Sequence, residues 1–299
     1  MYSNLLETVR NASVLLGSGA EDAILSFLQS QQASDGGFTG RSGNDSDIYY
    51  TMYAAMLYAA FTGGIPQKLA EYIKKTASDT KLDFIHTCAL GRLYALMSGG
   101  AVDAECKECL QKRLAEYRSL DGGFSHSAKF AEYGTPYGAF LAAAAYDELQ
   151  VEIQDKELLV ASVTVCRTPD SGFANQRGAL CGTANATAAA VAYLAVYNHS
   201  GGIPAGTSEF VMKLYADNGG FRASGQSPFA DVLSTGSLLF AMFEAGLSLS
   251  PEKAAATLGM IEHCWTDSGG FTGYPEDSVS DCEYTFYALL AVGALARTE

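Results

Sequence analysis

The strongest constraint on the fold of this chain is an internal repeat of about 50 residues. Six copies of the repeat account for all 299 residues. A Gly-Gly-Phe or Ser-Gly-Phe tripeptide ends at Phe38, Phe124, Phe173, Phe221 and Phe271. Between 10 and 14 residues later, a threonine opens a segment rich in Ala, Leu and Tyr, at Thr51, Thr135, Thr183, Thr235 and Thr285. Thr87 opens the remaining copy, which lacks the tripeptide.

Each repeat has the pattern of two helices. Residues 21–32 carry apolar side chains on one helical face and end at a glycine pair, which is a common helix terminator. Segments that follow the threonine, such as 51–61 and 183–197, are apolar on nearly every side, so these helices must be buried. Amphipathic outer helices that alternate with buried inner helices form a closed double ring. We therefore predict an all-α fold, one (α/α)6 toroid domain spanning residues 1–299.

The amino-acid composition argues against some classes of function. With 33 acidic and 19 basic residues, the net charge is -14, which argues against nucleic-acid binding because phosphates require clustered Lys and Arg. No apolar run reaches the roughly 18 residues that a membrane span needs. No signal peptide is evident either, so we expect a cytoplasmic protein. Seven cysteines, an odd number, are typical of reduced thiols.

Four of the inner segments begin with Asp-x-x-x-Thr, where the aspartate is Asp47, Asp83, Asp231 or Asp281. In repeats three and four this alignment puts Ala131 and Ala179 at the same position. Aspartate here would cap the helix and complement its dipole. Six such N-termini would also converge on one mouth of the ring, so both a structural and a binding role remain open.

Two motifs carry a family resemblance. Residues 27–38 resemble the Q-W repeat of triterpene cyclases, with Phe in place of Trp, and residues 43–51 are similar to the first repeat of Rab geranylgeranyltransferase β subunits. The sequence thus resembles the superfamily of protein-prenyltransferase β subunits and terpene cyclases over its whole length. This resemblance implies a toroid that binds an isoprenoid diphosphate in a central chamber and transfers or cyclises it. It also leaves a partner subunit open.

Aromatic residues, 11% of the chain, fall largely on the inner segments, where they would form either an isoprenoid chamber or an ordinary core.

The resemblance also indicates where zinc ligands would stand. Family D-x-C and D-x-x-H-T motifs fall, by repeat order, on Asp231, Leu233 and Tyr284, and only Asp231 is an ordinary zinc ligand. Cys181 matches the D-x-C cysteine in repeat four, and His86 matches D-x-x-H-T in repeat two. Because these residues belong to separate sectors, we expect no metal and no cofactor.

The diphosphate motif of the same family matches Arg41 in Gly-Gly-Phe-Thr-Gly-Arg. Lys129, Arg177 and Arg222 lie in other loops that follow the phenylalanines and could join it around the mouth. Solvated loop cations are the alternative.

Triterpene and class II diterpene cyclases carry D-x-D-D before the same threonine, and its middle Asp protonates the substrate. Repeat six reads Asp281-Cys282-Glu283-Tyr284-Thr285, which puts Glu283 at that position. A carboxyl group among apolar side chains has a raised pKa, as a general acid requires. The alternatives are a structural Glu283 and a non-catalytic binding or scaffold toroid.

We expect the polar head of the ligand at the mouth and its apolar part in the chamber. The predicted catalytic residues are Glu283 and Asp281. The predicted substrate-binding residues are Arg41, Asp47, Tyr50, His86, Cys181, Asp231 and Tyr284.

Overall fold

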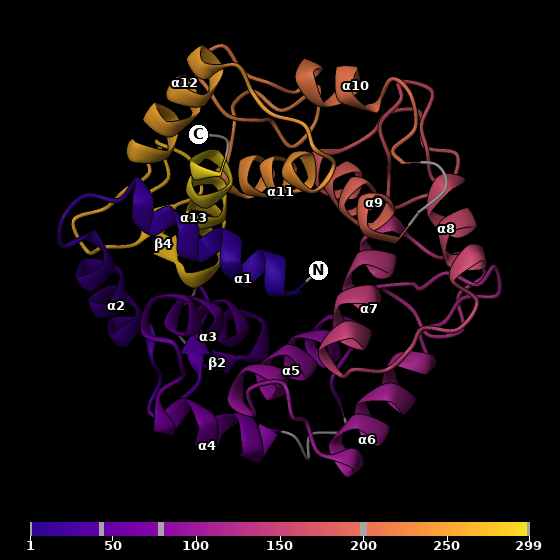
Figure 1. Cartoon of the computed structure of the whole chain (residues 1–299), viewed down its shortest axis with the longest axis horizontal. Helices are drawn as coiled ribbons and strands as arrows, with labels where there is room; N and C mark the ends of the chain where they lie inside the picture. Colours follow the sequence, from indigo (N-terminus) through magenta and orange to yellow (C-terminus); the bar gives the residue numbers. More distant parts are fainter. Residues whose placement is uncertain (1, 42–44, 77–80, 198–201, 298–299) are drawn as a thin grey trace.

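The computed structural model describes residues 2–41, 45–76, 81–197 and 202–297, and it forms a closed double ring of helices (Figure 1). The six inner helices are α3 (Ile48–Thr62), α5 (Phe84–Met97), α7 (Pro136–Glu148), α9 (Ala184–Tyr197), α11 (Val232–Glu244) and α13 (Cys282–Ala296). The six outer helices are α2 (Ala20–Gln31), α4 (Gln67–Thr76), α6 (Ala104–Ala115), α8 (Lys156–Thr164), α10 (Thr207–Lys213) and α12 (Pro251–Glu262). Helix α13 packs against α3 and closes the ring. The predicted all-α toroid is confirmed.

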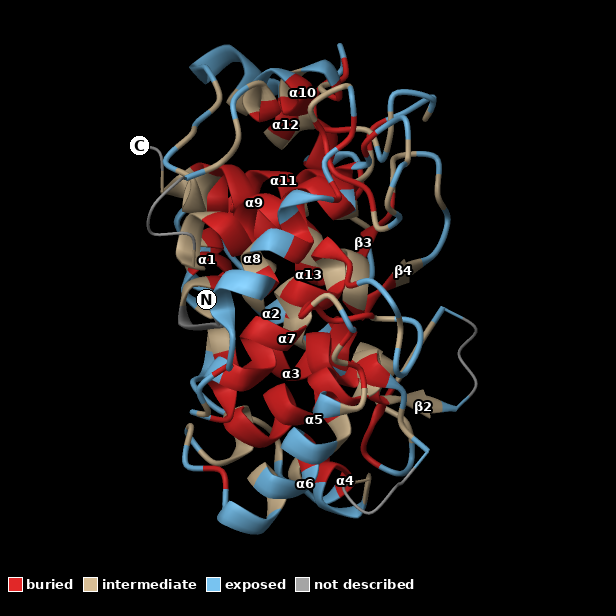
Figure 2. Ribbon diagram, turned by 90° about the vertical axis from the view of Figure 1, so that its right-hand side faces the viewer, coloured by how far each residue is buried: buried red, intermediate tan, exposed pale blue. Residues whose placement is uncertain are grey.

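Burial follows the division that the sequence predicts. Most side chains of each inner helix are buried, whereas an outer helix such as α2 buries only Ile24, Phe27 and Leu28. Figure 2 shows the same contrast, with the buried residues concentrated on the inner helices. The hydrophobic core is therefore a continuous belt around the ring.

The phenylalanines of four of the five tripeptides are tied to an inner helix by one repeated hydrogen bond. The buried amide of Phe221 donates to Oγ1 of Thr235 at 2.9 Å. Equivalent bonds join Phe38 to Thr51, Phe173 to Thr187 and Phe271 to Thr285. At Gly219, φ is +97° and an added Cβ would lie 2.2 Å from the Ala256 carbonyl oxygen, so only glycine fits this turn.

This bond corrects the alignment of two repeats. In repeat four the bonded threonine is Thr187, while Thr183 directly precedes α9, with its Oγ1 3.4 Å from the amide of Ala186. Thr135 likewise caps α7 by accepting from the amide of Gly138 at 3.0 Å. Thr135 and Thr183 thus occupy the capping position that we assigned to Ala131 and Ala179, and that assignment was wrong. Threonine and aspartate both cap helices, which made the two positions look alike.

Two short antiparallel pairs set the entry of the first and last inner helices. Strand β1 (Phe38–Thr39) pairs with β2 (Ser46–Asp47), and β3 (Phe271–Thr272) pairs with β4 (Ser280–Asp281). Their registers put Phe38 opposite Asp47 and Phe271 opposite Asp281. Each pairing holds the capping aspartate beside the buried phenylalanine. Residues 43 and 44 of the first-repeat motif lie outside the described residues.

Helix α1 (Tyr2–Asn11), followed by the short helix η1 (Ala12–Val14), lies across one end of the ring (Figure 1). Its Asn4 donates to the Glu244 carboxylate at the C-terminus of α11, and Arg10 donates to the Ala59 carbonyl near the end of α3. Helix α1 therefore covers the end where the inner helices finish, and the mouth lies at their N-termini. Among the described residues, no helix is both long and apolar enough to cross a membrane.

Candidate functional site

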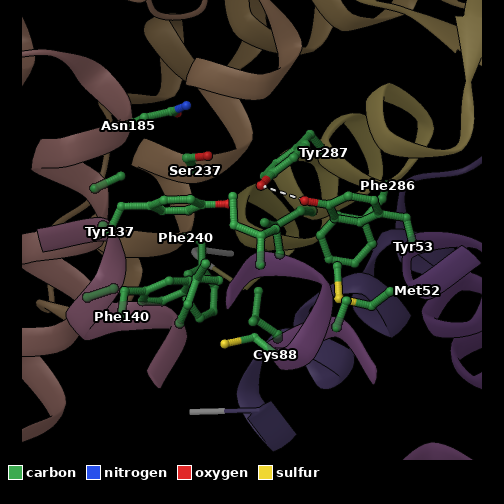
Figure 3. A pocket seen from close by; sticks show the side chains of 18 of the residues that line it. Met52, Tyr53, Cys88, Tyr137, Phe140, Asn185, Ser237, Phe240, Phe286 and Tyr287 are labelled. Carbon is green, nitrogen blue, oxygen red and sulfur yellow. Dashed lines mark hydrogen bonds between the residues drawn. The ribbon is translucent and has the colours of Figure 1, made fainter. Parts of the chain in front are cut away.

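A chamber occupies the middle of the ring. Its empty space is about 910 Å³, its opening to solvent included, and its wall draws on all six inner helices and on Leu5 of α1. Figure 3 shows Tyr137 and Phe140 on one side, facing Tyr53, Phe286 and Tyr287 on the other. Small-molecule sites are likewise lined mostly by apolar and aromatic side chains.

The rim of the chamber is formed by one position of the repeat, two residues before the buried threonine or its equivalent. The residues at this position are Tyr49, Ile85, Tyr137, Asn185, Leu233 and Glu283. The first five line the chamber, and Glu283 is bonded to one of them, Tyr49. Among its six residues, this position of the repeat thus presents a single carboxyl group, that of Glu283, among mainly apolar and aromatic side chains. Counting back two residues from the phenylalanine-bonded threonine would have found four of these six residues in the sequence, namely Tyr49, Asn185, Leu233 and Glu283.

Glu283 is held in a partly buried position by a residue from the opposite end of the chain. The hydroxyl of Tyr49 donates to its Oε1 at 2.6 Å. Burial raises the pKa of Glu283 to about 7, against the opposing effect of this hydrogen bond, and the nearby Asp281 carboxylate adds to the rise. The carboxyl is therefore substantially protonated at neutral pH.

Three tyrosine hydroxyls continue inward from Glu283. The hydroxyl of Tyr53 donates to that of Tyr49 at 3.0 Å, and the hydroxyls of Tyr53 and Tyr287 are 3.1 Å apart. The ring of Tyr53 also packs against Phe286, with centroids 5.0 Å apart. Tyr49, Tyr53 and Tyr287 all line the chamber. This chain of hydroxyls was not predicted from the sequence.

Asp281, the other predicted catalytic residue, caps α13 from a buried position beside the chamber wall. Its Oδ1 accepts from the amide of Tyr284 at 2.8 Å. Within the described part of the chain, its buried Oδ2 has no hydrogen-bond partner, and Nε of Arg41 is 3.9 Å away. Burial raises the pKa of Asp281 to about 6. Asp281 does not line the chamber.

Arg41 joins the first repeat to the last. Its Nη2 donates to both carboxylate oxygens of Asp277 at 2.7 and 2.8 Å, and its guanidinium lies 5.0 Å from the ring centroid of Tyr284. Lys129 pairs with Glu116, and Arg177 pairs with Asp121. None of these three cations lines the chamber. Their acidic partners hold them in the rim loops.

His86 bridges two neighbouring inner helices. Its Nδ1 is 2.7 Å from the Asp83 carboxylate, and its Nε2 is 3.2 Å from Oδ2 of Asp47. The hydrogen bond with Asp47 raises the pKa of His86 to about 9, and Asp83 contributes further. At neutral pH the ring is therefore a cation between two carboxylates. Tyr50 stands beside this bridge, with its ring edge-on to that of Tyr49 at 5.7 Å.

The remaining two predicted residues lie away from the chamber wall. Asp231 caps α11, and its two oxygens accept from the amide and the hydroxyl of Ser234 at 2.7 and 2.8 Å. Cys181 is exposed in the loop before α9. The corrected alignment of repeat four puts it two residues before the capping position, so its match to the D-x-C motif was wrong.

The chamber wall contains a buried ion pair that was not predicted from the sequence. Arg92 of α5 lines the chamber, and its Nε is 2.5 Å from Oε1 of Glu148 at the end of α7. Burial raises the pKa of Glu148 despite the neighbouring guanidinium. A single arginine inside an otherwise apolar inner segment was the available signal.

The zinc positions of the resemblance do not form a fitting site. The oxygens of Asp231 are engaged by Ser234, and Leu233 offers no donor atom. Across the described ranges, no group of three or more His, Cys, Asp and Glu side chains is arranged to hold a metal ion. The residues present therefore do not reproduce the zinc ligands of prenyltransferases.

Comparison with known proteins agrees with this architecture. The family model of the prenyltransferase alpha-alpha toroid domain matches residues 5–201 and 111–289. Among solved structures, a variant of the type II terpene cyclase MstE from Scytonema, in complex with its substrate geranylgeranyl dihydroxybenzoate, is 16% identical, with a TM-score of 0.61 and coverage of 99% of this chain and 98% of that one. The geranylgeranyltransferase-I of Candida albicans, complexed with GGPP, is 15% identical, with a TM-score of 0.52 and coverage of 97% and 90%. No curated protein matches the sequence. The chain thus belongs to the prenyltransferase alpha-alpha toroid family.

Proposed function

We propose that this protein binds an isoprenoid chain in its central chamber and starts cyclisation by protonating it from Glu283. The observation that carries this proposal is the position of one carboxyl group, with a pKa of about 7, on the rim of an aromatic chamber. A general acid must be protonated at the working pH and must reach the reacting atom. Glu283 meets the first condition, and its place on the rim supports the second.

The chamber also suits the cation that protonation creates. Tyr53, Phe286 and Tyr287 line one side of the chamber (Figure 3), and aromatic faces attract positive charge. The hydroxyl of Tyr49 stabilises the Glu283 carboxylate that remains after proton transfer. The carbon cation and the Glu283 carboxylate are thus stabilised by different groups.

The polar head of the ligand would remain at the mouth, beside Tyr50, Tyr284 and the His86 bridge. The His86 ion bridge and the caps of Asp47 and Asp231 position the rim helices, and Asp281 raises the pKa of Glu283. A diphosphate is not required by this arrangement, because Arg41 is engaged by Asp277. A partner subunit remains a prediction.

The test compares wild type with Glu283→Gln, using geranylgeranyl dihydroxybenzoate and geranylgeranyl diphosphate as probes. The variant removes the acid at nearly constant volume, so cyclisation should fall by about 100-fold or more. In deuterated water the wild-type product should gain one deuterium, because the initiating proton exchanges with solvent. Glu276→Gln, in an exposed rim loop, is the matched control. Full turnover in Glu283→Gln would refute the acid role, and solvent deuterium in the wild-type product would support it.

Binding without chemistry is the second candidate. The Glu283–Tyr49 bond joins the last inner helix to the first, so it would also serve a purely structural role in closing the ring. Saturable binding of both probes with no product from wild type would favour this candidate.

A further inference from the structure

The hydroxyls of Tyr49, Tyr53 and Tyr287 form a continuous chain from the chamber to Glu283. Tyr49 and Tyr53 are one turn apart on α3, and Glu283 and Tyr287 are one turn apart on α13. Residues four apart share a helix face, so the two pairs interlock across the junction of the helices. The three oxygen–oxygen distances are 2.6 Å from Tyr49 to Glu283, 3.0 Å from Tyr53 to Tyr49 and 3.1 Å between Tyr53 and Tyr287.

An ionised Glu283 fixes the direction of every bond in this chain. A carboxylate can only accept, so Tyr49 must donate to it. Each phenol has one proton, so Tyr49 can only accept from Tyr53, and Tyr53 can only accept from Tyr287. After Glu283 has given up its proton, all three O–H bonds therefore point from the chamber toward the carboxylate.

We propose that this tyrosine chain ends the cyclisation by returning a proton from the product cation to Glu283, with Tyr287 as the group that takes it from the substrate. This inference rests on the proposed function. It adds a second catalytic residue, Tyr287, and two relay residues, Tyr53 and Tyr49.

The proton balance of the cycle is closed. Glu283 adds its proton to a terminal double bond, whose π electrons form the new C–H bond and leave a carbon cation. Ring closure converts further π electrons into C–C bonds and moves the cation along the chain. A C–H bond beside the final cation then breaks, and its electron pair forms a double bond.

The released proton binds the oxygen of Tyr287, whose own proton passes to Tyr53. The proton of Tyr53 passes to Tyr49, and that of Tyr49 passes to the Glu283 carboxylate. The product is an isomer of the substrate, and Glu283 is again protonated. Rotation of the three hydroxyls restores their starting orientation.

The surroundings favour a concerted transfer along this chain. Burial raises the pKa of Tyr49 and Tyr53 well above that of a free phenol, and it raises the pKa of Tyr287 to about 12. A separate phenolate is therefore too costly to form. Each hydroxyl must give up one proton as it receives another.

Two variants test the relay in different ways. Tyr287→Phe keeps the aromatic ring and removes the hydroxyl that takes the proton from the product cation. Tyr53→Phe leaves the Tyr287 hydroxyl in place and disconnects it from Glu283. The measurement is the ratio of water-quenched alcohol to alkene in whatever product is formed from geranylgeranyl dihydroxybenzoate. Tyr58→Phe, a buried tyrosine of α3 that does not line the chamber, is the matched control.

Both chain variants should raise the alcohol-to-alkene ratio by about tenfold or more, because one decade corresponds to about 1.4 kcal/mol between the competing barriers. The control should keep the wild-type ratio. A wild-type ratio in Tyr53→Phe would overturn the relay even if Tyr287→Phe shifts it, because the two hydroxyls would then act independently. Failure of the proposed function is distinguishable, because wild type itself would then form no cyclised product.

Discussion

The hydrogen bond from Tyr49 sets how strongly Glu283 holds its proton. Tyr49→Phe removes this bond and also the bond that Tyr49 accepts from Tyr53. A hydrogen bond to a charged group is worth about 1.5–3 kcal/mol, and 1.36 kcal/mol corresponds to a change of one in pKa. Only the ionised carboxylate loses this stabilisation in the variant. The pKa of Glu283, about 7 in the wild type, should therefore rise by about 1 to 2 in Tyr49→Phe.

The assay is an NMR titration of protein labelled with ¹³C at the glutamate carboxyl carbons, with the resonance of Glu283 assigned by its absence in Glu283→Gln. Tyr58→Phe controls for loss of a phenol from the same helix and should leave the titration unchanged. In the pH dependence of turnover, the limb assigned to Glu283 should move upward by the same amount. An unchanged or lowered pKa in Tyr49→Phe would refute the account of how this carboxyl is held.

Two further predictions concern stability, measured by urea unfolding. His86→Gln should lower the free energy of unfolding by about 1–2 kcal/mol below pH 6.5. Because the folded pKa of His86 is raised to about 9, this difference should disappear as pH rises through 9, and a difference that persists at pH 10 would contradict the ion bridge. Thr235→Val leaves the buried amide of Phe221 without a partner and should cost about 1–3 kcal/mol. Thr87→Val, whose hydroxyl donates to the Asp83 carbonyl, should cost less, and equal losses would count against the amide bond.

The fold could be predicted because the repeat, the Gly-Phe turns and the contrast between amphipathic and all-apolar helices each have a local sequence pattern. The exact register could not, because Thr183 and Thr187 are both threonines near the start of one helix. Their roles differ only in the long-range bond from Phe173 to Thr187. Spacing carries the missing information, since the bonded threonine follows its phenylalanine by 13 or 14 residues in all four repeats that have the bond.

The candidate site was predictable only where one repeat contains all the relevant residues. The match of repeat six to an acidic cyclase motif pointed to Glu283 without other information. Its partner Tyr49 lies 234 residues away in sequence, and the ring closure that joins them has no local signal. For the same reason the partner of Arg41 was not predicted. The sequence left Arg41 as a possible free loop cation, whereas in the structure it is paired with Asp277.

Closure of the ring by α13 and α3 has a consequence for how this protein unfolds. An open array of stacked repeats has two terminal units, which can fray while the centre stays folded. Here every inner helix packs against two others around the ring, so there is no terminal unit to loosen first. Losing one hairpin would expose apolar surface on both of its neighbours, and unfolding should therefore be cooperative over the whole circumference. The junction that closes the ring joins residues such as Arg41 and Asp277, 236 positions apart, and contacts at such long range favour slow folding.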